Sequence, residues 1–218
     1  MNEDKIFKTI EDRVKKLFDS ESSGHDFYHL KRVFNLALKI QEGEGGDKII
    51  IGVASLVHDI HRLMDSGSNK NVSPEESLPR VSELLTEDLL TKNQIDKILN
   101  CVKYHEVYNF ADGKLDLDLE TKILQDADRI DAIGAIGIGR CFTYCGHFNI
   151  PMWLPDIPLA EKYNFETKDP SALHHFFLKL LKLGDNMNTK TGQMIAKARH
   201  HYIEDFVKQF MSEWAGEK

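Results

Sequence analysis

Apolar residues recur at intervals of three and four positions through most of this 218-residue chain, and this spacing limits the folds available to it. An α-helix places residues three and four apart on one face, whereas a half-buried strand alternates apolar and polar residues. In the segment from Asp26, the apolar side chains fall at Leu30, Val33 and Ala37. We find no alternating run, internal repeat or low-complexity tract. The sequence therefore predicts an all-α fold.

Helix-capping signals mark the start of several of these helices. Asp47 precedes an apolar run and can cap it, as can Thr91 further along the chain. Ser73 is followed by Pro74 and Glu76, which combines an N-cap, a proline in the first turn and a capping-box glutamate. We therefore expect helices to begin after each of these positions.

Residues 146–170 interrupt the helical pattern. They hold four of the chain's six prolines, Pro151, Pro155, Pro158 and Pro170. Proline disfavours helix, and a long loop in a compact domain is usually functional, so we interpret this one as a lid over a cleft or as a homodimer contact.

Two helices are expected after the loop, from 171 to about 183 and from about 189 to 214. The apolar face of the second is expected to carry Ile195, Ala198, Tyr202, Phe206 and Phe210. The whole chain, 1–218, is expected to form a single domain with its core at about 20–140 and with 171–214 as a C-terminal helix pair.

Composition narrows the class of protein. Hydrophobic residues make up 41% and charged residues 29%, with a net charge of -7, as in ordinary globular proteins. The acidic balance argues against binding to duplex nucleic acid, and the charged N-terminal segment resembles neither a signal peptide nor a membrane span. Cys101, Cys141 and Cys145 lack a C-x-x-C spacing, which favours reduced thiols and a cytoplasmic location.

Four residues with metal-binding side chains stand on apolar helix faces: His29, His58, Asp59 and Asp128. An unpaired polar group in such a place is costly, and two imidazoles with two carboxylates can hold a divalent metal while leaving coordination positions open. Each residue alone could instead be a satisfied core residue. The separations of 29 and 69 positions require different helices to converge, as in helical-bundle metal sites.

The sequence motifs around these residues resemble those of the HD-domain metal-dependent phosphohydrolase superfamily. The segments are "HDFYHLKRV", "VHDIHR" and "ADRIDAIGAIGIGR", together with the C-terminal stretch that begins "HFFLKLLKLGDNMNTKTGQ". The match runs from about Asp26 to Trp214 and is similar to the YpgQ/YedJ-like group of stand-alone HD proteins. The bare HD dipeptide is weak, but the ordered four-part signature is specific.

The resemblance implies an HD-domain helical bundle whose metal ligands are His29, His58, Asp59 and Asp128. It further implies a Mn²⁺-dependent pyrophosphohydrolase that converts a nucleoside triphosphate to the monophosphate and pyrophosphate. Mg²⁺, Co²⁺, Ni²⁺ and Fe²⁺ also suit such ligands. The same four residues could support a nucleoside monophosphatase or a cyclic-nucleotide phosphodiesterase, and a non-catalytic, metal-stabilised nucleotide-binding protein is a further alternative.

Other residues are candidates for supporting roles. Proton transfer or phosphate contact is assigned to His61, His105 and Glu106, and phosphate binding to Arg32, Lys103, Lys179, Lys182 and Arg199. Asp131 lies three after Asp128 and could accept the N–H of a ligand histidine. For each, the alternative is a buried structural side chain or a solvated helix face.

The glycines of "IGAIGIGR" suggest a phosphate-binding loop at first sight. They follow a helical pattern rather than a strand, and the segment lacks the GK[ST] ending of such loops. Close packing of a helix through small residues is the better interpretation.

Overall fold

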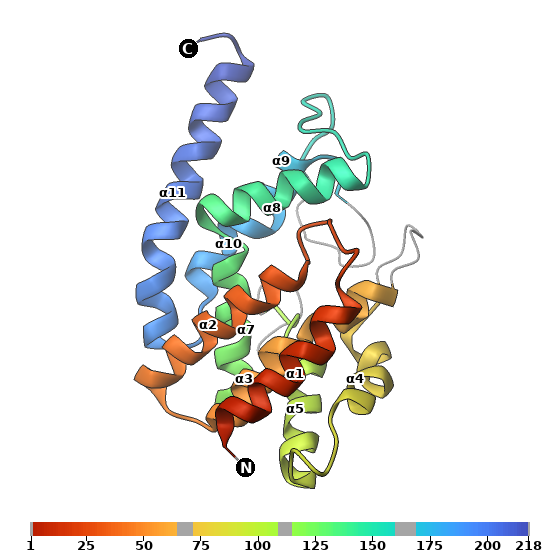
Figure 1. Ribbon diagram of the computed structural model, residues 1–218. Coiled ribbons are helices and arrows are strands. Elements are labelled where there is room, and N and C mark those ends of the chain that lie inside the picture. Colours follow the sequence, from red (N-terminus) through yellow and green to blue (C-terminus); the bar gives the residue numbers. More distant parts are fainter. Residues whose placement is uncertain (1, 65–71, 109–114, 160–168, 218) are drawn as a thin grey trace.

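The computed structural model describes residues 2–64, 72–108, 115–159 and 169–217. Within these ranges the regular structure is entirely helical, with no strand (Figure 1). The predicted all-α class is therefore confirmed. Among the described residues, no helix is both long and apolar enough to cross a membrane.

The N-terminal part is a bundle in which α3 lies at the centre, packed against α1, α2, α5 and α7. Its apolar side chains are almost all buried, which explains why this helix reads as a continuous hydrophobic run. The helices span Glu3–Leu17 (α1), Phe27–Glu44 (α2), Lys48–Val57 (α3), Lys92–Tyr104 (α5) and Leu119–Asp131 (α7). The expected caps are present, since Asp47 accepts from two backbone N–H groups of α3 and Thr91 forms a capping box with Gln94.

The chain changes helix type at the end of α3. A 3₁₀ segment, His58–Met64, follows directly, and Asp59 within it has non-helical dihedral angles (φ −94°, ψ 16°). After the undescribed residues 65–71, Ser73 forms the predicted capping box ahead of a 3₁₀ turn, Pro74–Ser77, and helix α4, Leu78–Leu84. The predicted start at Ser73 is therefore confirmed.

The C-terminal part packs on the bundle through α8 (Gly134–His147) and α11 (Lys190–Trp214). The first expected helix after the loop consists of α9 (Ala172–His175), a π-helical turn (Phe176–Leu180), α10 (Leu181–Leu183) and a 3₁₀ turn (Gly184–Asn186). In Figure 1, α11 runs along one side of the molecule, and its end lies far from the N-terminus.

The predicted apolar face of α11 is correct at three of its five positions. Ile195, Phe206 and Phe210 are partly buried and pack against the core. Ala198 and Tyr202 are exposed instead, and the fully buried positions are Ala196, Ile203 and Val207. The exposed pair fits the same three-and-four spacing as the contact face, so periodicity alone could not exclude it.

The proline-rich segment is anchored where the structure describes it. Trp153 is buried against His174, with ring centroids 4.8 Å apart, and the carbonyls of Pro151 and Met152 accept hydrogen bonds from the start of α9. Residues 160–168 of the proposed lid or dimer contact lie outside the described residues.

Candidate metal centre and adjoining cavity

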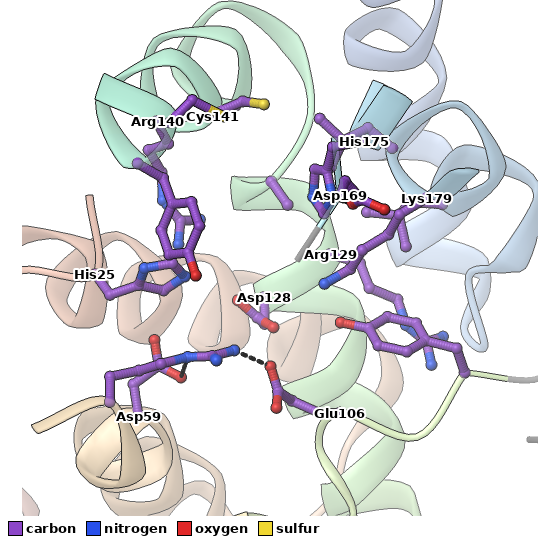
Figure 2. A pocket seen from close by; sticks show the side chains of 18 of the residues that line it. His25, Asp59, Glu106, Asp128, Arg129, Arg140, Cys141, Asp169, His175 and Lys179 are labelled. Carbon is purple, nitrogen blue, oxygen red and sulfur yellow. Dashed lines mark hydrogen bonds and ion pairs between the residues drawn. The ribbon is translucent and has the colours of Figure 1, made fainter. Parts of the chain in front are cut away.

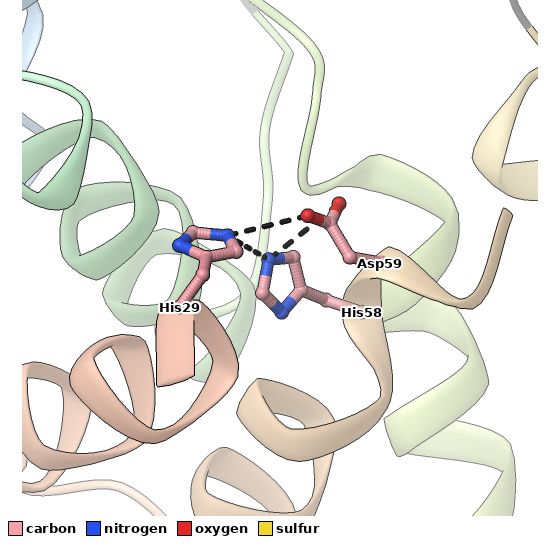
Figure 3. A group of neighbouring side chains, drawn as sticks. All are labelled: His29, His58 and Asp59. Carbon is pink, nitrogen blue, oxygen red and sulfur yellow. Dashed lines mark hydrogen bonds and ion pairs between the residues drawn. The ribbon is translucent and has the colours of Figure 1, made fainter. Parts of the chain in front are cut away.

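His29, His58, Asp59 and Asp128 come together from three elements of the bundle. His29 lies in the first turns of α2, the His58–Asp59 pair follows α3, and Asp128 lies in α7. His29 Nε2 is 3.2 Å from both His58 Nε2 and Asp59 Oδ2 (Figure 3). It is 3.5 Å from Asp128 Oδ1. Neighbouring ligands of an ion with bonds of about 2.0–2.2 Å lie roughly 3–3.6 Å apart, so this spacing suits a single metal ion.

The hydrogen bonds of the two imidazoles show why a cation fits between them. His29 Nδ1 donates to Asp131 Oδ2 at 2.8 Å, and His58 Nδ1 donates to the carbonyl of Ser55 at 2.9 Å. In a neutral imidazole the other ring nitrogen then carries a lone pair. Two such lone pairs face each other here at 3.2 Å, beside a buried Asp59 oxygen that has no hydrogen-bond partner. This donor set fits a divalent metal.

Burial and neighbouring charges act on these ligands in opposite directions. Burial lowers the pKa of His58 to about 4, so this imidazole is neutral near pH 7. Burial and Arg140 also oppose a charge on His29, but its hydrogen bond to Asp131 and the negative charge of Asp59 outweigh them and raise its pKa. The same carboxylates that favour a proton on His29 favour a metal ion between the ligands.

Asp131 holds His29 in place, as the sequence suggested it could. Its carboxylate also accepts from Arg32 Nε at 2.8 Å and from Arg140 at 3.0 Å. Although burial disfavours its charge, these partners lower the pKa of Asp131 far below its ordinary value. Asp131 is therefore ionised and orients the ring of His29 from behind.

His61, His105 and Glu106 gather on the other side of Asp59. His105 Nε2 lies 3.7 Å and His61 Nε2 3.9 Å from Asp59 Oδ1, and Glu106 Oε2 lies 3.4 Å from His61 Nε2. All three side chains are buried. They thus form a group contiguous with the metal centre.

Arg62 pairs with Glu106 and also lies 3.7 Å from Asp59. Burial opposes the charge of both partners, but Arg62 lowers the pKa of Glu106, and Glu106 with Asp59 raises that of Arg62. Both side chains are therefore ionised at neutral pH.

A cavity of about 1050 Å³, including the space at its open mouth, adjoins this centre. In Figure 2, Asp59 and Glu106 lie on one side and His175 and Lys179 on the other, with Asp128 between them. The lining is mixed, with charged and histidine side chains from His25, Asp59, Arg62, Glu106, Asp128, Arg129, Arg140, Asp169, His175 and Lys179. Tyr108, Cys141, Tyr144, Cys145, Ile150, Leu180 and Leu183 supply most of the remaining wall.

The basic residues selected from the sequence have different locations. Lys179 lines the cavity, whereas Lys182 is not among the described residues that do. The others engage protein groups: Arg32 binds Asp131, Lys103 binds Glu75 at 2.6 Å, and Arg199 donates to the carbonyl of Ile130.

Sequence reasoning missed several lining residues that stand beside its own motifs. His25 is the first residue of "HDFYHLKRV", Arg62 follows "HDIH", Arg129 follows Asp128, and Arg140 ends "IGAIGIGR". The arginines in or beside these motifs were the signal from which their place in the cavity wall could have been predicted. His175 had no comparable signal, because only the folding of the C-terminal helices brings it to the cavity.

Comparison with known proteins agrees with this geometry. Residues 26–133 match the model of the HD domain family. The chain is 36% identical over 220 residues to YpgQ of Bacillus subtilis, covering 99% of this chain and 97% of YpgQ.

Solved structures with the same fold include a Lactobacillus plantarum protein (29% identity, TM-score 0.82, 97% and 98% of the two chains). An HD-superfamily hydrolase from Bacillus thuringiensis superposes with a TM-score of 0.71 at 34% identity over 98% and 99% of the chains. Bacillus subtilis YpgQ in complex with ADP gives 0.70 at 30% identity over 98% and 97%. The converged His and Asp ligands, the family match and these relatives together show that this chain belongs to the HD superfamily of hydrolases, as a relative of YpgQ.

Proposed function

We propose that this protein is a metal-dependent pyrophosphohydrolase that splits a nucleoside triphosphate into the monophosphate and pyrophosphate. The observation that carries the proposal is the opening of the four-ligand centre directly into a large cavity with basic side chains. Asp59 and Asp128 line both the centre and the cavity. A polyphosphate in the cavity can therefore reach the ligands.

The charge balance of the cavity favours an anionic substrate once a metal is bound. Among the described lining residues, the carboxylates Asp59, Glu106, Asp128 and Asp169 are matched in number by Arg62, Arg129, Arg140 and Lys179. Burial lowers the pKa of His25 and His175, so these two side chains add no charge near pH 7. A divalent cation makes the cavity electropositive, which attracts phosphate groups.

The chain's own groups bind and orient the phosphates. When bound, Mn²⁺ polarises phosphoryl oxygens and acidifies water, which is the chemistry that phosphoanhydride hydrolysis needs. Arg140 and Arg129 are held by backbone carbonyls, Gly24 for the first and Asn186 and Val107 for the second. Their positions are thus fixed before a substrate arrives, and a preorganised cation stabilises phosphate charge without reorganisation.

The remaining wall suits a nucleoside. Ile150, Leu180 and Leu183 provide apolar surface beside the charged groups, as is usual for sites that bind small organic ligands. The ADP complex of YpgQ, a relative with the same fold, supports a nucleotide as the ligand here.

The test is a product analysis with the purified protein, Mn²⁺ and a panel of ribo- and deoxynucleoside triphosphates, monophosphates and cyclic nucleotides. Pyrophosphate and monophosphate in equal amounts are the expected products, with no turnover by Asp128→Asn. Orthophosphate from a monophosphate would show a monophosphatase instead. Opening of a cyclic nucleotide would show a phosphodiesterase.

A third outcome concerns binding without turnover. If the protein bound ADP and Mn²⁺ but hydrolysed none of the panel, the non-catalytic, metal-stabilised nucleotide-binding alternative would be correct.

A further inference from the structure

Two thiols stand on one face of α8, in the wall of the cavity. Cys141 and Cys145 are four positions apart in this helix, and side chains with this spacing are neighbours on a helix surface. Both thiols are nearly buried, at 8% and 6% exposure, and both line the cavity. A pair of thiols can chelate an ion, and neither the metal centre nor the proposed hydrolysis uses this pair.

The two sulfurs act on each other. The Cys141 thiol lowers the pKa of Cys145, whereas the Cys145 sulfur raises the pKa of Cys141 well above its ordinary value. Opposite shifts of this kind are those of a donor and an acceptor, so Cys145 is the first of the two to become a thiolate. The thiolate is the form of cysteine that binds metal ions.

Helix geometry favours a bridging atom over a direct disulfide. Cβ atoms of residues four apart on a helix are about 5–6 Å from each other. A disulfide requires about 3.5–4.5 Å between them, so closing it would distort α8. Two bonds of about 2.3 Å to one tetrahedral ion, the length of a zinc–thiolate bond, hold the sulfurs roughly 3.8 Å apart instead. The pair therefore suits a bridging ion while the helix stays regular.

We propose that Cys141 and Cys145 form a chelating site for a thiophilic ion, Cd²⁺ or trivalent arsenic, in the wall of the cavity. The negative charge of Asp169 acts on both thiols and favours a cation beside them. His175 Nδ1 donates to this carboxylate at 2.6 Å and fixes its position. In Figure 2 the Cys141 sulfur is directed to the side of the cavity on which Asp169 and His175 lie. Thiolates select soft ions, so this site differs in preference from the His and Asp centre.

An ion on this pair should compete with the nucleotide, and this part of the inference rests on the proposed function. Arg140, the residue before Cys141, is one of the preorganised cations of the cavity. On the other side of the pair, Ile150 donates its N–H to the Cys145 carbonyl at 2.7 Å and supplies apolar wall. Along the chain, the thiols thus lie between a phosphate-binding side chain and the nucleoside wall.

The test treats the intact protein with phenylarsine oxide under native conditions. The arsenic forms one bond to each sulfur, the two thiol protons leave with its oxygen as water, and the arsenic remains trivalent. Mass spectrometry should show one phenylarsenic bridge per chain, stable to 2-mercaptoethanol and released by 2,3-dimercaptopropanol. Trypsin should place the bridge on residues 141–162, the peptide that holds both cysteines.

Variants of single thiols test the chelation. Cys141→Ser and Cys145→Ser should each lose the adduct that withstands 2-mercaptoethanol, whereas Cys101→Ala in α5, the matched control, should keep it. Cd²⁺ added to the wild type should give the ultraviolet absorption of Cd–thiolate bonds, which ligands without sulfur lack, and this absorption should weaken in both serine variants. In the wild type, the arsenic bridge should also lower the affinity for ADP at least tenfold in titration calorimetry.

No stable adduct on the native wild type, or a stable adduct in either serine variant, would overturn the dithiol site. The peptide map decides the same question on the wild type alone, so the answer does not depend on the folding of a variant. A bridged protein that binds ADP as tightly as the untreated one would disprove the competition with nucleotide. If the untreated protein bound no nucleotide at all, the proposed function would fail and the thiol site would stand.

Discussion

His29 and Asp131 are 102 positions apart in the chain, yet His29 Nδ1 donates to Asp131 Oδ2 at 2.8 Å. Two arginines from different helices, Arg32 in α2 and Arg140 in α8, hold the same carboxylate. A hydrogen bond on one side of the ring thus determines which way His29 Nε2 faces. If His29 binds the proposed metal ion, the strength of binding should depend on residues that do not touch the ion.

Replacing Asp131 by asparagine should weaken Mn²⁺ binding by about 10- to 100-fold, because loss of the carboxylate releases the ring orientation and basicity of His29. Titration calorimetry of the variant measures the loss. Asp116→Asn, at a fully exposed carboxylate, is the control and should bind like the wild type. Unchanged affinity in Asp131→Asn would contradict a positioning role for Asp131.

Replacing Lys179 by alanine should raise KM for the nucleotide about tenfold, equivalent to about 1.4 kcal/mol, since one cation is lost from the cavity wall. The Mn²⁺ affinity should stay the same. Lys182→Ala, one turn further on, provides the comparison, and steady-state kinetics distinguish the two. Equal KM values for both variants would remove Lys179 from the phosphate-binding groups.

Metal removal should lower the melting temperature of the wild type, because chelation leaves buried lone pairs facing one another. Adding Mn²⁺ at 100 times its dissociation constant should restore about 2.7 kcal/mol. Differential scanning calorimetry with and without chelator measures the change. Asp128→Asn should show a smaller Mn²⁺-dependent gain than the wild type, and an equal gain would place the stabilising ion elsewhere.

Replacing Asp126 by alanine should destabilise the fold by roughly 2–4 kcal/mol, because each unsatisfied buried donor costs about 1–3 kcal/mol. Its carboxylate accepts from the backbone N–H groups of Asn188 and Thr189 and from the Thr189 hydroxyl, so it joins α7 to the start of α11. Urea denaturation gives the free energy of unfolding. The variant should still bind Mn²⁺ when folded, since Asp126 is not a ligand.

Cys101 should not react with a thiol reagent at pH 8 in the native protein. Burial raises the pKa of its thiol to about 12, so the reactive thiolate is scarce four pH units below, and the side chain is also inaccessible. Mass spectrometry after iodoacetamide treatment should show Cys101 modified only in denaturant. Rapid native labelling would mean that the α5–α7 contact opens readily.

The four candidate metal ligands could be picked out from the sequence because two independent signals coincide at them. His29 and Asp128 fall on apolar helix faces, where a polar side chain is costly, and they also belong to ordered family motifs. The all-α class followed from the same periodicity. Capping residues such as Ser73 and Thr91 located helix starts, because their side chains act within a few residues of themselves.

The residues of the cavity wall were harder to predict from the sequence, because a long basic side chain can reach in many directions from one backbone position. Arg32 and Lys103 were predicted to bind phosphate, and in the structure each binds a carboxylate of the protein. Arg62 and Arg140 stand beside the motifs, and only the packing of α8 and the 3₁₀ segment on the bundle directs them to the cavity. Tyr202, which was predicted to be packed and is exposed, shows the same limit for apolar residues. Periodicity does not reveal which face of a helix packs against another element.

The change from α- to 3₁₀-helix at His58 has a consequence for protein design. Neighbours on a regular α-helix diverge by about 100°, so two consecutive side chains cannot ordinarily meet at one point. Here α3 ends at Val57, Asp59 leaves helical geometry, and its Oδ1 lies 3.6 Å from His58 Nε2. Transplanting the His–Asp dipeptide alone into the middle of a straight helix should therefore not create a metal site. A designer would have to copy the helix end as well.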